Sequence, residues 1–533
     1  MTSRLWRSGE PFIWLTGGAL ATALIMVGGL VAIIVVNAAG FFWPAEIVRL
    51  TLKDGSVLTG PVAEREGVPG TTDAWRVKIK VANRDLYGAD FVWADEAAIT
   101  RRERPGDVAV VERTEWGILI GTIMALKEGA VTVAAGPAAW PEIERRLPAA
   151  AALRAEIRKV EKSDIGAINH EQEKLRRRLR ALEARGATSG ADGEAARARL
   201  ATLDEAYKVQ ETRLADLRGK QLATLVVAAD GGKEKELPLA QVLDVSFPNA
   251  MGWLAKAGRY VAGVWSFVSD APRESNTEGG VFPAIFGTVM MVMLMSIMVT
   301  PLGVLAAFYL REYARQGTFV SVVRIAVNNL AGVPSIVFGV FGVGFFIYGL
   351  GGAIDQLFYA EALPTPTYGT GGILWASLTL ALLTIPVVIV ATEEGLAAIP
   401  GGTREASLAL GATKLETTLK VVLPAVMPSI LTGLILAMAR AAGEVAPLMI
   451  TGVVKLAPAL PVDGFWPFVH LDRKFMHLGF HIYDVGFQSP NVDAARPMVF
   501  TTTLLLLAIV VVLNLFAIAT RNRLRRKYAT SAV

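Results

Sequence analysis

Two opposite charges stand four residues apart inside a long apolar run in the second half of the chain. Arg440 and Glu444 both lie within residues 425–450. Residues four apart share one face of a helix, so the two side chains can form an ion pair. An arginine at mid-membrane costs roughly 2.5–3.5 kcal/mol on insertion scales, so both side chains are expected to face the interior of a helical bundle. The pair is either a structural link between packed helices or a functional group. In the functional reading Arg440 contacts a passing anion. Glu444 then holds the arginine in place and keeps it from binding the anion too tightly.

Polar residues also interrupt the apolar run of residues 319–350. Asn328 and Asn329 lie within it, where an amide that faces lipid is costly. Pro334 and Ser335 follow and predict a kink, because proline cannot continue the hydrogen-bond pattern of a helix. Such a break is tolerated in a membrane where protein or a cavity satisfies the freed backbone groups. The two amides either bond to neighbouring helices or have a functional role.

The residue types exclude several kinds of chemistry. The chain has no cysteine, which excludes disulfides, thiol catalysis and cysteine-based metal sites. It has four histidines, which leaves little room for a histidine metal cluster. No G-x-x-x-x-G-K-S/T phosphate loop occurs, so ATP hydrolysis is not expected in this chain. We predict neither a catalytic site nor a metal site.

Composition divides the 533 residues into membrane and soluble parts. Hydrophobic residues make up 53% and the mean hydropathy is +0.44, which indicates an integral membrane protein. Charged residues still make up 19%, so a sizeable soluble region is also expected. A signal peptide at residues 12–36 is the less favoured alternative to a membrane helix, because the run is long and no clear A-x-A site follows. We predict six membrane helices, near residues 12–36, 282–308, 319–350, 373–391, 425–450 and 497–519.

The soluble region spans residues 37–271. Alternating apolar and polar residues predict strands in its first part, and Asp54-Gly55 is typical of a hairpin turn. We expect a small β-barrel or sandwich there. Residues 142–221 are instead rich in Arg, Lys, Glu, Ala and Leu at helical spacing, with glycines in the middle. This pattern predicts an antiparallel helical hairpin inserted in the β-domain, with no catalytic constellation.

Basic residues predict the orientation in the membrane. Arg4 and Arg7 precede the first run, and further basic residues follow the second and the sixth. Residues 351–372, on the opposite side, contain no Lys or Arg. By the positive-inside rule both termini are cytoplasmic and residues 37–271 are extracytoplasmic.

The loop of residues 393–424 contains residues that typically end and start helices, which a flexible linker would not need. Pro400 and the two following glycines end the preceding helix, and Thr403 can cap a short new one. Gly411 stands where a left-handed residue ends that helix. Thr413 and Glu416 have the spacing of a capping box and start a second helix. The result is a helix, a glycine corner and a second helix on one membrane face.

The same loop resembles the EAA loop of ABC importer permeases. Glu405, Ala406 and Ser407 stand for Glu-Ala-Ala, with Gly411, Leu423 and Pro424 at the matching spacing. Ser407 in place of the second alanine is a small departure. Three further stretches, GGVFPAIFGT from residue 279, NNLAGVPSIVFGVFG from residue 328 and ARAAGEVAPLMITG from residue 439, resemble PstA-type permeases of phosphate ABC importers. The resemblance covers residues 279–528 and leaves the soluble region out.

The resemblance implies a polytopic α-helical membrane protein of the bacterial inner membrane, with five of its helices in a permease domain at 279–528. It implies that the short helix of the loop docks on a cytoplasmic ATPase dimer, which binds the ATP and Mg, so no cofactor is expected in this chain. It also implies a second, similar permease subunit and an external phosphate-binding protein. The helix with Asn328, Asn329 and Ser335 would line the substrate path, and the family carries the same Arg and Glu at the positions of Arg440 and Glu444. Transport would proceed by alternating access.

Two alternatives remain at this point. The first is a permease of the same type for another oxyanion, because the residues alone do not distinguish phosphate from a similar anion. The second is a membrane sensor or scaffold that acts through its external domain. The spacing of the loop argues against a simple anchor, which has no need of an ATPase docking site.

Overall fold

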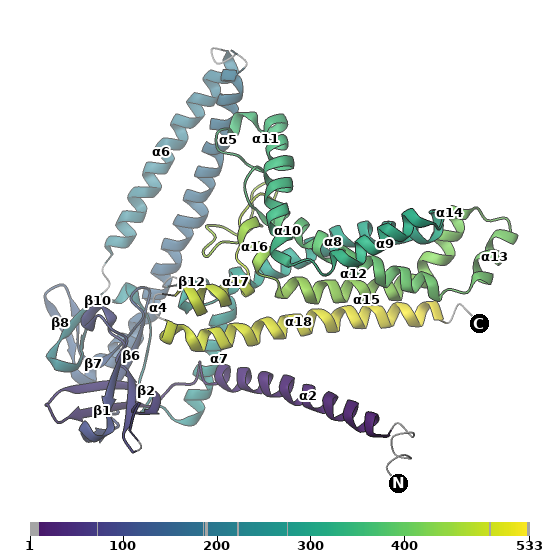
Figure 1. Ribbon diagram of the computed structural model, residues 1–533. Helices are drawn as coiled ribbons and strands as arrows, with labels where there is room; N and C mark the ends of the chain where they lie inside the picture. Colours follow the sequence, from purple (N-terminus) through teal and green to yellow (C-terminus); the bar gives the residue numbers. More distant parts are fainter. Residues whose placement is uncertain are drawn as a thin grey trace, which may run out of the picture.

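The computed structural model of the chain describes residues 10–71, 73–184, 186, 190–220, 223–273, 276–489 and 492–529. Arg4 and Arg7, on which part of the orientation argument depends, lie outside these residues. The long apolar helices lie side by side, the strands gather at one end of this bundle, and a pair of long helices projects from the same end (Figure 1).

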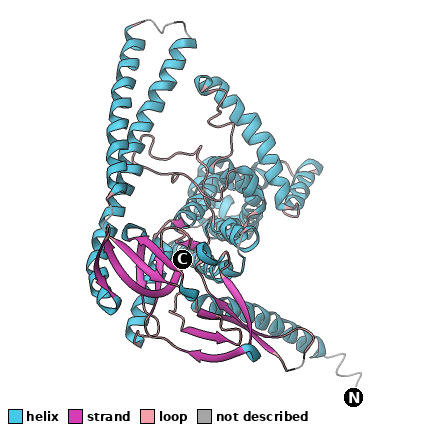
Figure 2. Cartoon of the chain, turned by 90° about the vertical axis from the view of Figure 1, so that its left-hand side faces the viewer, coloured by secondary structure: helices cyan, strands magenta, loops and turns pink. Residues whose placement is uncertain are grey.

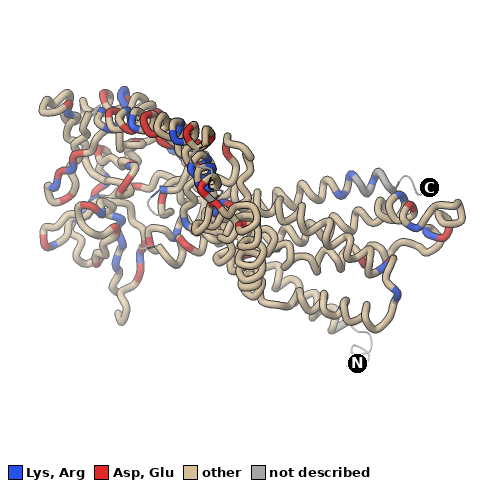
Figure 3. The backbone as a smooth tube through the Cα atoms, turned by 90° about the horizontal axis from the view of Figure 1, so that it is seen from above, with Lys and Arg blue, Asp and Glu red and all other residues tan. Residues whose placement is uncertain are grey.

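The predicted number of apolar helices of membrane-spanning length is confirmed. Within the described residues, six helical stretches are long and apolar enough to cross a membrane. Few charges interrupt them, and basic residues gather at the end of the bundle away from the strands (Figure 3). The six stretches are Phe12–Ala39, Phe282–Tyr313, Ser335–Phe358, Ile373–Ala398, Lys414–Gly443 and Val492–Arg523.

The single helix predicted over residues 319–350 is wrong. Helix α9 (Thr318–Leu330) ends before Pro334, whose ψ of 135° is extended, and α10 (Ser335–Phe341) starts afresh. The apolar run then continues through a π-helical segment, Gly342–Gly351, into α11 (Gly352–Phe358). This second part turns across the direction of the long helices (Figures 1 and 2). The proline causes more than the expected kink, because the residue before a proline is also disfavoured in the helical region.

The helix predicted over residues 425–450 is also broken. Helix α15 (Leu423–Gly443) stops at Glu444, which has an extended ψ of 135°, and α16 (Ala446–Thr451) follows. Pro447 lies in the first turn of α16, the place in a helix where the missing N–H of proline costs least. Glu444 therefore lies at a helix end.

The membrane core consists of α8 (Phe282–Phe308), α12 (Ile373–Ala398) and α15. Buried side chains of these helices, among them Met295, Leu380 and Ala441, form one cluster. Glycines permit close contact: a Cβ on Gly303 would lie 2.7 Å from the Val388 side chain. Helix α18 (Val492–Ala529) packs on α15, and α2 (Glu10–Ala39) lies against α18 with most of its side chains exposed.

The soluble region forms two antiparallel sheets, each with its own buried apolar cluster. The order in the first is β4-β3-β2-β1-β5, and that in the second is β10-β9-β7-β6-β11 with β8 beside β7. Gly55, at a φ of +85°, lies in the turn between β1 and β2, as the Asp-Gly pair predicts. The strands are β1 (Ile47–Leu52), β2 (Val57–Gly67), β3 (Trp75–Lys80), β4 (Phe91–Asp95), β5 (Ile99–Glu103), β6 (Val108–Arg113), β7 (Ile118–Glu128), β8 (Val131–Ala135), β9 (Thr224–Ala228), β10 (Glu234–Pro238) and β11 (Val242–Ser246).

Long helices connect β8 with β9 of the same sheet. They are α4 (Ala139–Lys159), α5 (Ile165–Ala184) and α6 (Ala191–Gly219). Ion pairs such as Arg199–Glu171 (3.0 Å) and Arg213–Glu156 (2.9 Å) join α6 to the α4–α5 stretch. The projecting helices reach back to the membrane part of the chain, where the ring of His170 stacks on Phe465 with centroids 4.7 Å apart.

Candidate functional site

The loop between α12 and α15 folds into two short helices at the end of the bundle away from the soluble region (Figure 1). Helix α13 (Gly401–Ala409) is closed by Gly411, which has the left-handed φ of +86° that its position predicts. The N–H of Gly411 donates to the carbonyl of Leu408 (3.0 Å), and that of Ala412 donates to Ser407 (3.3 Å). These two bonds form the Schellman motif that commonly ends a helix at a left-handed residue.

The second short helix, α14 (Lys414–Thr417), begins with the predicted capping box. The backbone N–H of Glu416 donates to the Thr413 hydroxyl, and the Glu416 carboxylate accepts from the Thr413 N–H at 3.0 Å. The predicted cap at Thr403 is wrong. Helix α13 already begins at Gly401, behind Pro400, and has no side-chain cap, so Thr403 lies inside its first turn.

The predicted coupling residues occupy two environments. Glu405 and Ala406 are exposed, and the tip beyond them presents Leu410 with 90% of its surface accessible. Ser407 faces inward, where its hydroxyl bonds to that of Thr417 at 2.9 Å. Leu423 and Pro424 are half-buried where α15 begins. Leu408 and Leu415 on the same corner are also exposed, and an exposed apolar patch of this kind is suited to contact with another protein.

Arg404 fastens this corner to the end of α8, a contact that the sequence analysis missed. Its guanidinium donates to Glu312 (2.8 Å) in the π-helical end of α8, and to the carbonyls of Ile399 and Leu396. A second contact joins the end of α8 to the π-helical segment that follows α14, since Tyr313 donates to the Thr418 hydroxyl at 3.4 Å. Movement of the corner would therefore reach α8 directly.

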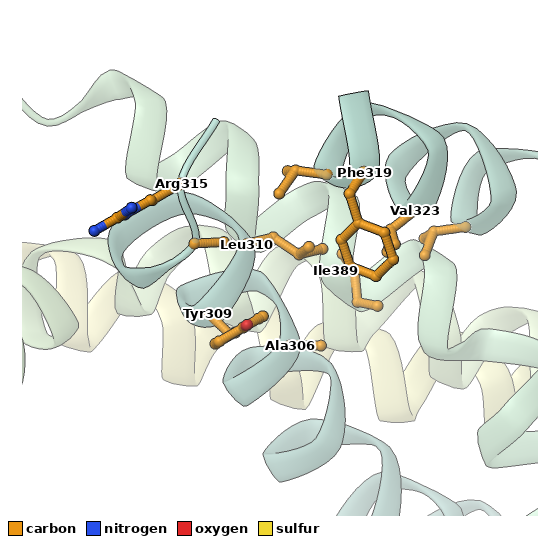
Figure 4. A pocket seen from close by; sticks show the side chains of 10 residues that line it. Ala306, Tyr309, Leu310, Arg315, Phe319, Val323 and Ile389 are labelled. Carbon is orange, nitrogen blue, oxygen red and sulfur yellow. The ribbon is translucent and has the colours of Figure 1, made fainter. Parts of the chain in front are cut away.

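An apolar cavity of 320 Å³ lies beside this joint, between the end of α8, the start of α9 and α12. Leu310, Phe319, Val323 and Ile389 line it, while the Arg315 side chain points away from the other labelled side chains (Figure 4). Arg324 of α9 bonds to Glu393 of α12 at 3.1 Å and to the carbonyl of Leu310 at 3.2 Å. The cavity thus lies between α8, α9 and α12, which the bonds of Arg324 already join.

Arg440 and Glu444 meet, but loosely. The distance from Arg440 Nε to Glu444 Oε1 is 3.5 Å, and the two side chains are 32% and 19% exposed. Among the residues that the structure describes, Arg440 has no other ion-pair or hydrogen-bond partner. The arginines of the two joints above each make several close bonds. Most of the N–H donors of Arg440 therefore have no partner among the described residues.

The remaining predicted path residues lie on neighbouring elements. Asn328 and Asn329 are exposed at the end of α9, and Ser335 is half-buried at the start of α10. Leu330 and Val333, which flank the turn between these helices, pack on the cluster that contains Ala437 and Ala441 of α15. The break between α9 and α10 thus lies beside the helix of Arg440, although neither asparagine is hydrogen-bonded to Arg440 in the part of the chain that the structure describes.

Residues 299–529 match the family model described as the binding-protein-dependent transport system inner membrane component. This part of the chain is similar to members of that family. The matched residues contain the short-helix corner, the Arg440–Glu444 pair and the broken run.

Curated relatives match part of the chain. The chain is 33% identical over 214 residues to the phosphate transport system permease protein PstA 1 of Mycobacterium tuberculosis (strain CDC 1551 / Oshkosh), covering 40% of this chain and 63% of the relative. It is 33% identical over 188 residues to PstA of Yersinia pestis, covering 35% of this chain and 57% of the relative. The chain thus spans less than two thirds of the length of these relatives.

Among solved structures, an inward-facing form of the MetNI methionine ABC transporter matches 49% of this chain and 97% of its own, at 18% identity and a TM-score of 0.33.

Proposed function

We propose that this chain is the membrane-spanning permease subunit of an ATP-driven importer that moves inorganic phosphate across the bacterial inner membrane. The geometry of the loop carries this proposal. A short exposed helix, an obligatory left-handed glycine and a capped second helix form a rigid corner that an ATPase can grip. The phosphate substrate is supported by the names of the relatives that share the permease domain.

In this proposal the ATP and Mg are bound by a separate ATPase dimer, and the chain itself needs no cofactor. Glu405, Ala406, Ser407 and Gly411 present the docking surface, and Leu423 and Pro424 connect it to α15. When ATP closes the ATPases, the corner moves. The Arg404–Glu312 bond then passes that movement to α8, so that the bundle opens alternately to the two sides of the membrane.

The proposed substrate path is placed at Arg440, whose ion pair with Glu444 is long. A guanidinium presents up to five donors and suits a tetrahedral oxyanion. Arg440 would contact the anion, and Glu444, at the break between α15 and α16, would orient Arg440 and limit the affinity. Asn328, Asn329 and Ser335, around the break between α9 and α10, would supply further polar groups along the path.

The partners in this proposal are a second, similar permease subunit, the ATPase dimer and an external phosphate-binding protein. Residues 37–271 would lie outside the cell as a domain in which the two sheets form a small sandwich or barrel and the long helices form a hairpin. Both termini would be cytoplasmic. The external domain extends over the permease domain through the His170–Phe465 contact, where it would flank an arriving binding protein.

We expect single-cysteine labelling to show this orientation, because the natural chain has no cysteine to remove. Glu205→Cys lies on α6 at a side chain that is 77% exposed, and Leu410→Cys lies at the tip of the corner. In intact cells without their outer membrane, a membrane-impermeant maleimide should label Glu205→Cys and spare Leu410→Cys. The reverse result would place the soluble region in the cytoplasm.

The direct test of the function is anion uptake in cells that lack this chain. Loss of phosphate uptake with normal sulfate uptake, restored by the chain, is the expected result. Loss of another oxyanion instead would assign a different substrate to the same mechanism. Unchanged uptake of every oxyanion would favour a sensor or scaffold that acts through residues 37–271.

A further inference from the structure

A cavity of 630 Å³ lies where the soluble region meets the ends of α2 and α18. Three parts of the chain form its walls. The segment that follows α2 contributes Phe41, Phe42 and Trp43, strand β3 contributes Lys78 and Lys80, and the first turns of α18 contribute Asp493, Arg496 and Phe500. Because these segments are far apart in the sequence, the cavity exists only when the soluble region is seated on the membrane helices.

Basic side chains predominate in this cavity. Lys78, Lys80, Arg259 and Arg496 line it, against the two carboxylates of Glu64 and Asp493. Arg259 is already neutralised, because it pairs with Glu112 at 3.1 Å and with Asp244.

Two of the other three basic side chains, Lys80 and Arg496, are not held by a close ion pair. Lys78 is 10% exposed and pairs with Asp493 at 2.5 Å. Arg496, which is 59% exposed, lies 3.6 Å from the same carboxylate, beyond hydrogen-bond distance. Lys80 is half-buried and has no ion pair among the residues that the structure describes. Lys80 and Arg496 can therefore both bind a further anionic group.

The position of the cavity coincides with the edge of the membrane. Trp43 is 38% exposed and follows the end of α2, and aromatic residues of this kind concentrate at membrane–water interfaces. Helix α7 (Trp253–Ser269) lies beside it, where Phe42 contacts Tyr260 with ring centroids 6.1 Å apart. Helix α7 exposes large apolar residues, Trp253, Leu254, Val261 and Trp265, each with at least 67% of its surface accessible. An amphipathic helix with exposed tryptophans is typical of a segment that lies in the interface plane.

We infer that this cavity binds a phosphate group, and that a phospholipid headgroup of the adjacent leaflet supplies it. Lysine and arginine bind phosphate oxygens through charge-assisted hydrogen bonds. Basic pockets beside membrane helices bind lipid headgroups in the same way. The aromatic wall of Phe42, Trp43 and Phe500 and the exposed sides of α2 and α18 would accommodate the acyl chains. Bound lipid would then hold the soluble region on the bundle independently of the direction or substrate of transport.

The inference is tested on the full chain purified in detergent with its membrane complex. Native mass spectrometry would follow titrations with dioleoylphosphatidylglycerol, dioleoylphosphatidylcholine and inorganic phosphate. The double variant Lys80→Gln/Arg496→Gln should bind phosphatidylglycerol roughly tenfold or more weakly than the wild type, because both charge-assisted contacts are lost. Arg65→Gln/Arg101→Gln is the matched control. It removes two charges from the same soluble region, at exposed side chains outside the cavity, and should bind as the wild type does.

The three probes distinguish the source of the phosphate group. Phosphatidylglycerol binding that inorganic phosphate does not displace supports the lipid. Saturation by inorganic phosphate, lost in the double variant, would retain the phosphate site but assign it to the free anion. Equal binding of all three probes by wild type and double variant would overturn the inference. If the double variant is unstable, Arg496→Gln alone provides the same comparison at an exposed side chain.

Discussion

Cells that carry Gly411→Val should lose phosphate uptake while the protein still inserts in the membrane. Gly411 has a φ of +86°, and no atom lies within 4 Å of the place where a Cβ would stand, so the damage comes from the backbone alone. A left-handed conformation costs an L-residue roughly 1–2 kcal/mol, and more when it is β-branched. The Schellman bonds to Leu408 and Ser407 then weaken, and the corner no longer presents α13 correctly. We expect uptake to fall roughly tenfold or more, together with loss of the ATPase from the purified complex.

A matched control separates coupling from general strain. Gly129, in the turn between β7 and β8, also has a positive φ of +60° and open space around it. Gly129→Val introduces the same kind of strain into the soluble region and should leave uptake and ATPase binding near the wild-type level. Full uptake by Gly411→Val would contradict the proposed role of the corner.

The double variant Arg440→Met/Glu444→Leu should assemble at a normal level and fail to move phosphate. Replacing both members of a structural ion pair by apolar residues of similar volume is often neutral, so this variant removes the charge and retains the packing. The Arg440–Glu444 contact is long, at 3.5 Å, and stabilises little by itself. We expect uptake to drop roughly tenfold or more, because the guanidinium that would meet the anion is lost.

A second ion pair among the apolar helices offers a close comparison for this experiment. Arg324 and Glu393 form a 3.1 Å pair whose side chains are 30% and 19% exposed, almost the same exposures as for Arg440 and Glu444. Arg324→Met/Glu393→Leu should lose some stability and retain transport per assembled complex. Wild-type uptake by Arg440→Met/Glu444→Leu, at normal complex levels, would show that the pair is structural.

Local signals in the sequence were sufficient for the corner. The conformation of Gly411 and the Thr413–Glu416 capping box depend on residues within a few positions of each other, so spacing alone predicts them. The prediction for Thr403 is wrong because the helix already begins at Gly401, directly after Pro400. Serine, threonine and proline give competing start signals, and their ranking depends on the backbone around them.

Contacts across the chain could not be predicted in this way. Arg404 and Glu312 are 92 positions apart, and Lys78 and Asp493 are 415 apart, so no periodicity connects them. The proline predicts the kink at Pro334, but hydropathy shows neither that a helix ends there nor that one ends at Glu444, since the apolar residues continue on both sides. It counts apolar length and is insensitive to the direction of the helix, so the turn of α10 and α11 across the bundle became visible only in three dimensions.

The most direct measurement of the central claim is phosphate accumulation by the purified complex. The complex that contains this chain would be reconstituted in liposomes with ATP on the ATPase side, and radioactive phosphate with the phosphate-binding protein would be added on the other side. We predict ATP-dependent accumulation of phosphate that excess unlabelled phosphate abolishes and excess sulfate does not, and that is absent from complexes with Gly411→Val. The proposal would be contradicted if the complex hydrolysed ATP without accumulating phosphate. This holds whether the complex moves another oxyanion instead or moves no anion at all.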